Sequence, residues 1–123
     1  MNKEKMIITG AIVFAFINVM ILTGLADNEK DQLVAEQHRL SEGFELINQE
    51  QFSEGASILE EFMETPYADA SVFHLYLARA YFTMEEYEQS HNHYQLAYNI
   101  DPNRLRNEGF LEELELVKEQ LNG

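Results

Sequence analysis

The chain of 123 residues contains no cysteine. It therefore has no disulfide framework, no thiol nucleophile and no thiolate metal site. The absence of cysteine does not indicate in which cellular compartment the protein works. It also has no glycine-rich phosphate loop, no Gly-x-Ser-x-Gly elbow and no recognisable arrangement of serine, histidine and aspartate. These absences remove the best-known nucleophilic and nucleotide-binding chemistries.

Basic residues are few. Eight lysines and arginines stand against 22 aspartates and glutamates, a formal net charge of −14. After residue 26, six basic residues oppose 21 acidic ones, a balance of −15 (6 minus 21). Such a field repels phosphate backbones and anionic lipid headgroups, so we predict no nucleic-acid binding and no peripheral adsorption to membranes. It favours basic or apolar partners, although it is equally the charge of a solubilising surface.

Acidic pairs invite a catalytic interpretation, which their setting opposes. The pairs are Glu60-Glu61, Glu85-Glu86 and Glu112-Glu113, and all are predicted to be exposed. Adjacent helix residues point apart, and glutamate is a good former of exposed helix. A catalytic carboxylate needs burial or a like-charge neighbour in a cleft. We therefore predict that the protein is not an enzyme.

The histidines do not form a metal motif. His91 and His93 are two residues apart, so on a helix they diverge, and His74 lies on a different predicted helix. Packed or solvent-facing histidines explain the pattern better than a tetrahedral site. We predict no metal and no cofactor.

Residues 6–25 contain no charge, and their only polar side chains are Thr9, Asn18 and Thr23. Twenty such residues span the hydrocarbon core of a bilayer as a helix, whose backbone groups are satisfied internally. The sequence therefore predicts a transmembrane helix over 6–25, with residues 1–5 as a short cytoplasmic N-terminus.

The flanking charges set the predicted topology. Lys3 and Lys5 precede the apolar run, and Asp27, Glu29 and Asp31 follow it. This bias favours a cytoplasmic N-terminus and an extracytoplasmic C-terminal domain on the cell membrane. The alternative is a signal peptide cleaved after Ala26, giving a secreted protein, but the run exceeds the usual 7–15-residue signal core.

Residues 71–104 predict a helix, a tight turn and a second helix that Pro102 ends. Small residues at Ala78, Ser90 and Ala97 let the two helices approach. The pattern consists of Leu77, Ala78, Tyr81, Tyr87, Ser90, Tyr94 and Ala97, closed by Asp101-Pro102-Asn103. This spacing resembles the tetratricopeptide repeat.

Residues 36–70 form a weaker copy of the same unit, displaced by 35 residues. The matching positions are Gly43, Leu46, Phe52, Gly55, Leu59 and Phe62. The copy departs from the pattern at Glu42, where a large apolar residue is usual, and at the bulky Phe62. Glu50-Gln51-Phe52 and Glu85-Glu86-Tyr87 mark the turns, and Pro66 ends the first pair.

Two flanking segments complete the predicted domain. Residues 26–35 are polar without proline or glycine, which predicts a helical linker. Residues 105–123 place Phe110, Leu114, Val117 and Leu121 on one helical face, which predicts an amphipathic capping helix for the repeats. Its alternative role is packing on a partner or a second copy. The predicted fold class is therefore all-α: a transmembrane helix, two helix-turn-helix tetratricopeptide-like repeats (36–70 and 71–104) and a C-terminal capping helix.

The resemblance to tetratricopeptide repeats implies a scaffold that holds a protein or peptide in a groove lined by the first helix of each repeat, here 36–49 and 71–83. Carried over position by position, the groove residues are Leu40, Phe44, Ile47, Leu75, Arg79 and Phe82. The set is mostly apolar with one arginine, which disfavours a clamp for a terminal carboxylate. In so small an array, flanking helices can equally cover Phe44, Ile47 and Phe82.

Three functional hypotheses follow. The leading one is a membrane-anchored scaffold or adaptor in a bacterium-like envelope, held by its N-terminal helix and binding an apolar or basic protein partner. The second is a chaperone-like factor that holds translocating or unfolded segments. The third is a structural homo-oligomer, in which Asn18 hydrogen-bonds a second copy in the bilayer.

Overall fold

The computed structural model describes residues 27–107 and 109–123, and this part of the chain is helical throughout, without strands. An all-α fold is thus confirmed. The elements are α2 (Asp27–Asn48), α3 (Phe52–Glu60), the 3-10 helix η1 (Pro66–Asp69), α4 (Ser71–Thr83), α5 (Tyr87–Ile100), α6 (Pro102–Asn107) and α7 (Phe110–Asn122).

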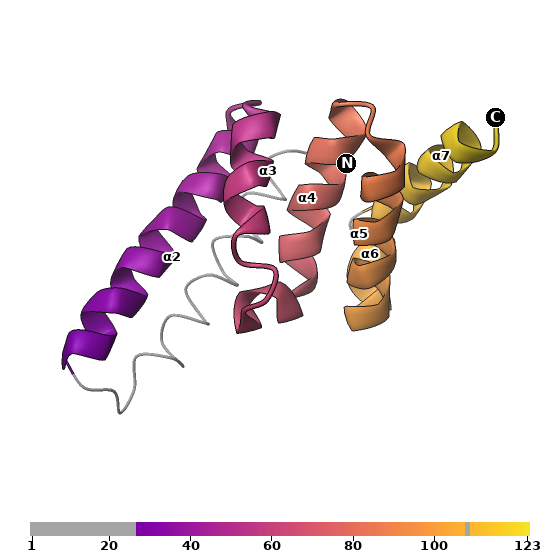
Figure 1. Cartoon of the computed structure of the whole chain (residues 1–123). Coiled ribbons are helices and arrows are strands. Elements are labelled where there is room, and N and C mark those ends of the chain that lie inside the picture. Colours follow the sequence, from indigo (N-terminus) through magenta and orange to yellow (C-terminus); the bar gives the residue numbers. More distant parts are fainter. Residues whose placement is uncertain (1–26, 108) are drawn as a thin grey trace.

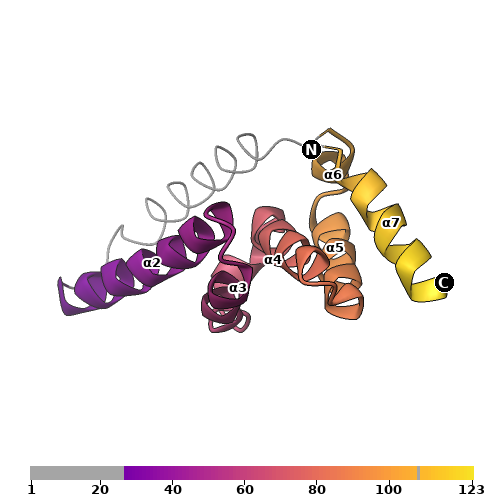
Figure 2. The same cartoon turned by 90° about the horizontal axis from the view of Figure 1, so that it is seen from above.

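Each helix packs mainly on its neighbour in the chain. Figure 1 shows them following one another from α2 to α7, and Figure 2 shows the same row from above. The largest contacts are within the pairs α2–α3 and α4–α5, with α3 packing on α4 and α5 on α7. The chain is therefore a stack of antiparallel helix pairs with a closing helix.

The two pairs turn in the same way. Glu50 and Glu85, at an offset of 35 residues, both have left-handed backbones, with φ of 67° and 62°. The turn hydrogen bonds are Glu50 N–H to Ile47 O (3.0 Å) and Gln51 N–H to Leu46 O (2.8 Å), then Glu85 N–H to Phe82 O (3.0 Å) and Glu86 N–H to Tyr81 O (2.9 Å). Both are Schellman caps, which satisfy carbonyls at the helix end. The turns predicted at these positions are confirmed.

Small residues allow close approach within each pair. In the first pair, a Cβ on Gly55 would lie 2.8 Å from the carbonyl oxygen of Gly43. In the second pair, the equivalent Ser90 hydroxyl donates a 2.8 Å hydrogen bond to the carbonyl of Ala78. The same two positions thus bring the two helices into close contact in both pairs.

Helix α4 is the centre of the core. Every residue of 71–78 is buried, and so is Ala80, because α3, α5 and η1 all pack around this helix. Leu59, Tyr94 and Phe110 bring side chains of α3, α5 and α7 into the same cluster. One hydrophobic core therefore runs through the described helices.

Helix α2 is longer than α3, the helix on which it mainly packs. It is continuous over the predicted linker and the first predicted repeat helix, and no residue of 28–36 is buried. The first buried side chain is Gln37. Figure 1 shows the N-terminal end of α2 extending away from α3. We call residues 28–36, none of which is buried by the described part of the chain, the overhang of α2.

The closing segment differs from the single helix predicted over 105–123. It contains two helices, α6 and α7, separated at Gly109, whose φ is 77°. Pro102 is the first residue of α6, where a missing amide donor is tolerated. The reversal at Gly109 lets Leu105 of α6 and Phe110 of α7 both reach the core, where each is fully buried.

The predicted fold class needs one correction. Among residues 27–107 and 109–123, no helix is long and apolar enough to cross a membrane. Even the longest, α2, carries charged side chains along its length. The segment predicted to span the bilayer, 6–25, lies outside the described residues. The predicted topology and the alternative of cleavage after Ala26 depend on that segment and stay predictions.

Candidate functional site

A pocket of about 390 Å³ opens between the C-terminal ends of α2 and α4, the start of α3 and helix α7. We call it the α2–α4 pocket. Its lining residues are Ile47, Asn48, Glu50, Phe52, Arg79, Phe82, Thr83 and Glu113. Ile47 and Phe82 occupy equivalent positions of the two helix pairs, 35 residues apart, as do Asn48 and Thr83. The pocket is thus built from the same helical turn of both pairs.

The structure separates the six predicted groove residues into three groups. Ile47, Arg79 and Phe82 line the α2–α4 pocket, although Ile47 is only 3% exposed and also belongs to the core. Leu40 and Leu75, 2% and 0% exposed, belong to the core and are not available to a partner.

Phe44 forms the third group. It is half-buried, and its ring meets those of Phe73 and Tyr76 edge to face, with centroids 6.5 Å and 4.7 Å away. This aromatic cluster joins α2 to α4. Phe44 therefore has a structural contact that accounts for its apolar character.

Arg79 is held by the closing helix. Its guanidinium forms an ion pair with Glu113 of α7, and its Cζ lies 5.2 Å from the centre of the Phe110 ring. Both charged side chains are less than one-fifth exposed. Burial, reinforced by the Glu113 charge, raises the pKa of the neighbouring Tyr94 hydroxyl. The arginine predicted to meet a partner is therefore neutralised within the chain.

The charge around the pocket disfavours anions. Besides the Arg79–Glu113 pair, the described lining contains one more charged residue, Glu50, so its formal charge is net negative. Ile47, Phe52 and Phe82 supply the apolar surface. A ligand for this pocket is best an apolar side chain with a cationic neighbour.

A second cluster lies within the α4–α5 pair, beside the end of α3, and was missed by the sequence interpretation. His74 of α4 and His93 of α5 are buried, 3% and 6% exposed, with their Nδ1 atoms 3.0 Å apart. The signal was present in the predicted contact of Ala78 with Ser90. Paired helices run in opposite directions, so His74, one turn before Ala78, faces His93, about one turn after Ser90.

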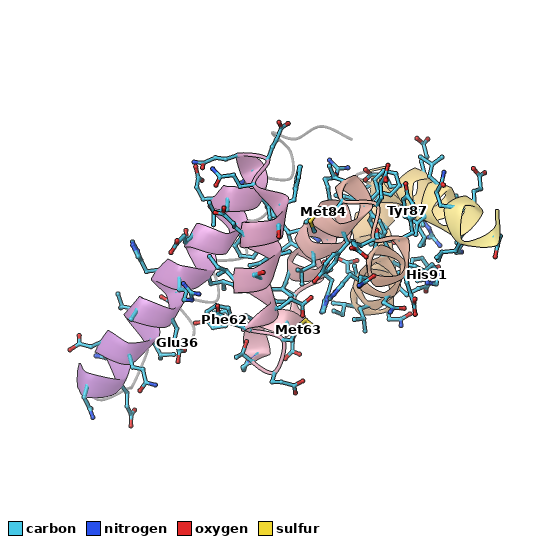
Figure 3. The ribbon with its side chains drawn as sticks, turned by 45° about the horizontal axis from the view of Figure 1, so that its top comes forward. Glu36, Phe62, Met63, Met84, Tyr87 and His91 are labelled. Atoms are coloured by element: carbon cyan, nitrogen blue, oxygen red, sulfur yellow. The ribbon has the colours of Figure 1, made fainter. Side chains whose placement is uncertain are left out.

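His91, on the same helix, is not part of this cluster and is only partly buried (Figure 3). Within 27–107 and 109–123, no group of three or more His, Cys, Asp or Glu residues is arranged to hold a metal ion. The histidine cluster is therefore best described by its hydrogen bonds.

Comparison with protein-family models, with curated proteins and with solved structures finds no significant match to this chain. The class that the fold defines is an all-α stack of antiparallel helix pairs. The tetratricopeptide likeness rests on the sequence pattern.

Proposed function

We propose that the chain is a protein-binding module of the tetratricopeptide type, which holds a segment of a partner protein in the α2–α4 pocket. The observation that carries the proposal is that equivalent positions of two repeated helix pairs, Ile47 and Phe82, line one pocket. Its volume of about 390 Å³ is within the range of sites that take a compact apolar group.

The proposed occupant is a segment with a large apolar side chain next to lysine or arginine. Phe52 and Phe82 offer apolar contact to the anchor, while the net negative formal charge of the lining favours its basic neighbour. The acidic excess of the whole chain adds long-range attraction for the same segment.

The test uses two short helical peptides of equal apolar content, one carrying lysines and the other glutamates at the polar positions. Binding to the full chain is measured by fluorescence anisotropy at low and high salt. We expect the lysine peptide to bind more tightly and to weaken with salt, because the favourable charges are solvent-accessible. Equal binding of both peptides would contradict the proposal and support general holding of unfolded segments.

Two variants locate the site. Thr83→Lys places a positive charge at the pocket, whereas Asn92→Lys places the same charge at an exposed position of α5 that does not line it. We expect Thr83→Lys to weaken binding of the lysine peptide roughly tenfold, about 1.4 kcal/mol. Asn92→Lys should weaken binding much less. Equal losses would mean that only net charge matters.

A further inference from the structure

Five groups from four elements form a continuous chain of polar contacts. The carbonyl of Ala68 in η1 lies 2.7 Å from Nε2 of His74, whose Nδ1 lies 3.0 Å from Nδ1 of His93. Nε2 of His93 lies 3.4 Å from Oε1 of Glu60, the last residue of α3. That carboxylate also accepts a 2.7 Å hydrogen bond from the Tyr81 hydroxyl.

The protons that these contacts require can be counted. A carbonyl only accepts, so Nε2 of His74 carries a proton. The two Nδ1 atoms need one proton between them, on either ring. A carboxylate also only accepts, so Nε2 of His93 needs a third proton to bond Glu60. Two neutral imidazoles carry only two protons, so the arrangement is complete when the pair holds one extra proton.

The other protonation states each lose a contact. With two protons, either a lone pair of His93 faces the Glu60 carboxylate or the lone pairs of the two Nδ1 atoms face each other. With four protons, both Nδ1 atoms carry hydrogen and oppose each other at 3.0 Å, while two adjacent imidazolium charges repel. The first proton therefore completes the network and the second breaks its central contact.

We propose that the His74–His93 pair makes the packing of α5 on α4 pH-dependent: one proton, balanced by Glu60, is accommodated, and a second forces the rings apart. The charged and titratable groups that face the pair are Glu60 from α3, Asp69 from η1 and Tyr81 from α4. This inference does not depend on the proposed function.

The electrostatics set the direction of the effect. Burial lowers the pKa of both histidines, and the neighbouring His74 charge lowers that of His93 further, while Glu60 opposes both shifts. In the unfolded chain each ring binds its proton near pH 6.5. Because the folded pKa values are lower, the unfolded state binds more protons below that pH, so stability falls as the pH drops from about 6.5 through the folded pKa values.

The first experiment follows the histidine ring ¹⁵N chemical shifts of the full chain, labelled and kept soluble in a non-ionic detergent, as the pH is lowered. We expect the two buried rings to titrate in separate steps. Glu60→Gln keeps an acceptor for Tyr81 and removes the charge, so proton uptake by the pair should move to lower pH by roughly one unit. Glu64→Gln, an exposed glutamate outside the network, is the matched control and should leave it unchanged.

The second experiment measures amide hydrogen-exchange protection of α4 and α5 over the same pH range, corrected for intrinsic exchange. Protection should fall as the second proton binds. His93→Gln removes the second titratable ring and should leave only the smaller fall that the lowered pKa of His74 causes, whereas His91→Gln should keep the full fall. Independent titration of the two rings that Glu60→Gln does not alter, or a loss of protection as large in His93→Gln as in the original chain, would overturn the proposal.

Discussion

The Ser90 hydroxyl donates a 2.8 Å hydrogen bond to the carbonyl of Ala78, and both residues are fully buried. This bond joins the two helices of the second pair. We expect Ser90→Ala to lower the free energy of unfolding by about 1 kcal/mol, the usual contribution of one hydrogen bond. Urea unfolding would measure it. Ser57→Ala, at an exposed position of α3, should change stability little, and an equal effect of both changes would contradict the assignment.

In the first pair, Gly55 fills the equivalent place. A Cβ there would lie 2.6 Å from Ile47 Cγ1 and 2.8 Å from the carbonyl oxygen of Gly43. We expect Gly55→Ala to destabilise the protein by about 2 kcal/mol, because overpacking outweighs the gain in helix propensity. Gly43→Ala should cost less in unfolding experiments, because its nearest contacts are side-chain atoms of Ile58 and Leu59. The reverse order would show that the helices adjust at Gly55.

The turn at Glu85 carries backbone strain that glycine would relieve. Its φ of 62° is uncommon for a residue with a side chain. We expect Glu85→Gly to raise the thermal midpoint, with a gain of about 0.5–1 kcal/mol. Glu86 has an ordinary φ of −91°, so Glu86→Gly should lower the midpoint by making the unfolded chain more flexible. If both changes lower it, strain at Glu85 is negligible.

The Arg79–Glu113 ion pair should hold the closing helix. A double-mutant cycle of Arg79→Met and Glu113→Gln is expected to give a coupling energy of about 1 kcal/mol, because the pair is shielded from water but not fully buried. Either change should also increase amide exchange in α7 more than in α2. A coupling energy near zero would mean that the contact of Arg79 with Phe110 carries the interaction.

Alkaline pH should destabilise the protein through its buried tyrosines. Burial raises the pKa of Tyr76 to about 12, while an unfolded tyrosine ionises near pH 10. A raised folded pKa means that the stabilising contribution is complete below about pH 10 and is lost as the pH rises toward 12. Tyr76→Phe should therefore lose less stability between those pH values, measured by urea unfolding. An identical loss in both proteins would exclude this residue.

The sequence predicted the pairs because their contacts are local. Small residues at Gly43, Gly55, Ala78 and Ser90 recur at one offset, and the structure places them in close contact between the paired helices. These contacts join consecutive helices, so the spacing of small residues along the chain is enough to predict them.

Contacts between pairs were harder to predict. Leu75 was assigned to a groove, but η1, α3 and α5 bury α4 on almost every side. Glu113 was assigned to a solvated face, yet it meets Arg79 because the reversal at Gly109 redirects α7. These contacts depend on the crossing angles between packed helices, and the apolar pattern of the sequence does not specify those angles.

The overhang at the beginning of α2 sets both the distance and the rotation between the first turn of α2 and the α2–α4 pocket. Its residues 28–36 extend about 14 Å at 1.5 Å per residue, and each residue also rotates the chain by about 100°. The α2–α4 pocket therefore has a fixed direction relative to the first turn of α2. Inserting one alanine in the overhang would move the pocket about 1.5 Å along the helix axis relative to the first turn of α2. It would also rotate the pocket by about 100° around that axis.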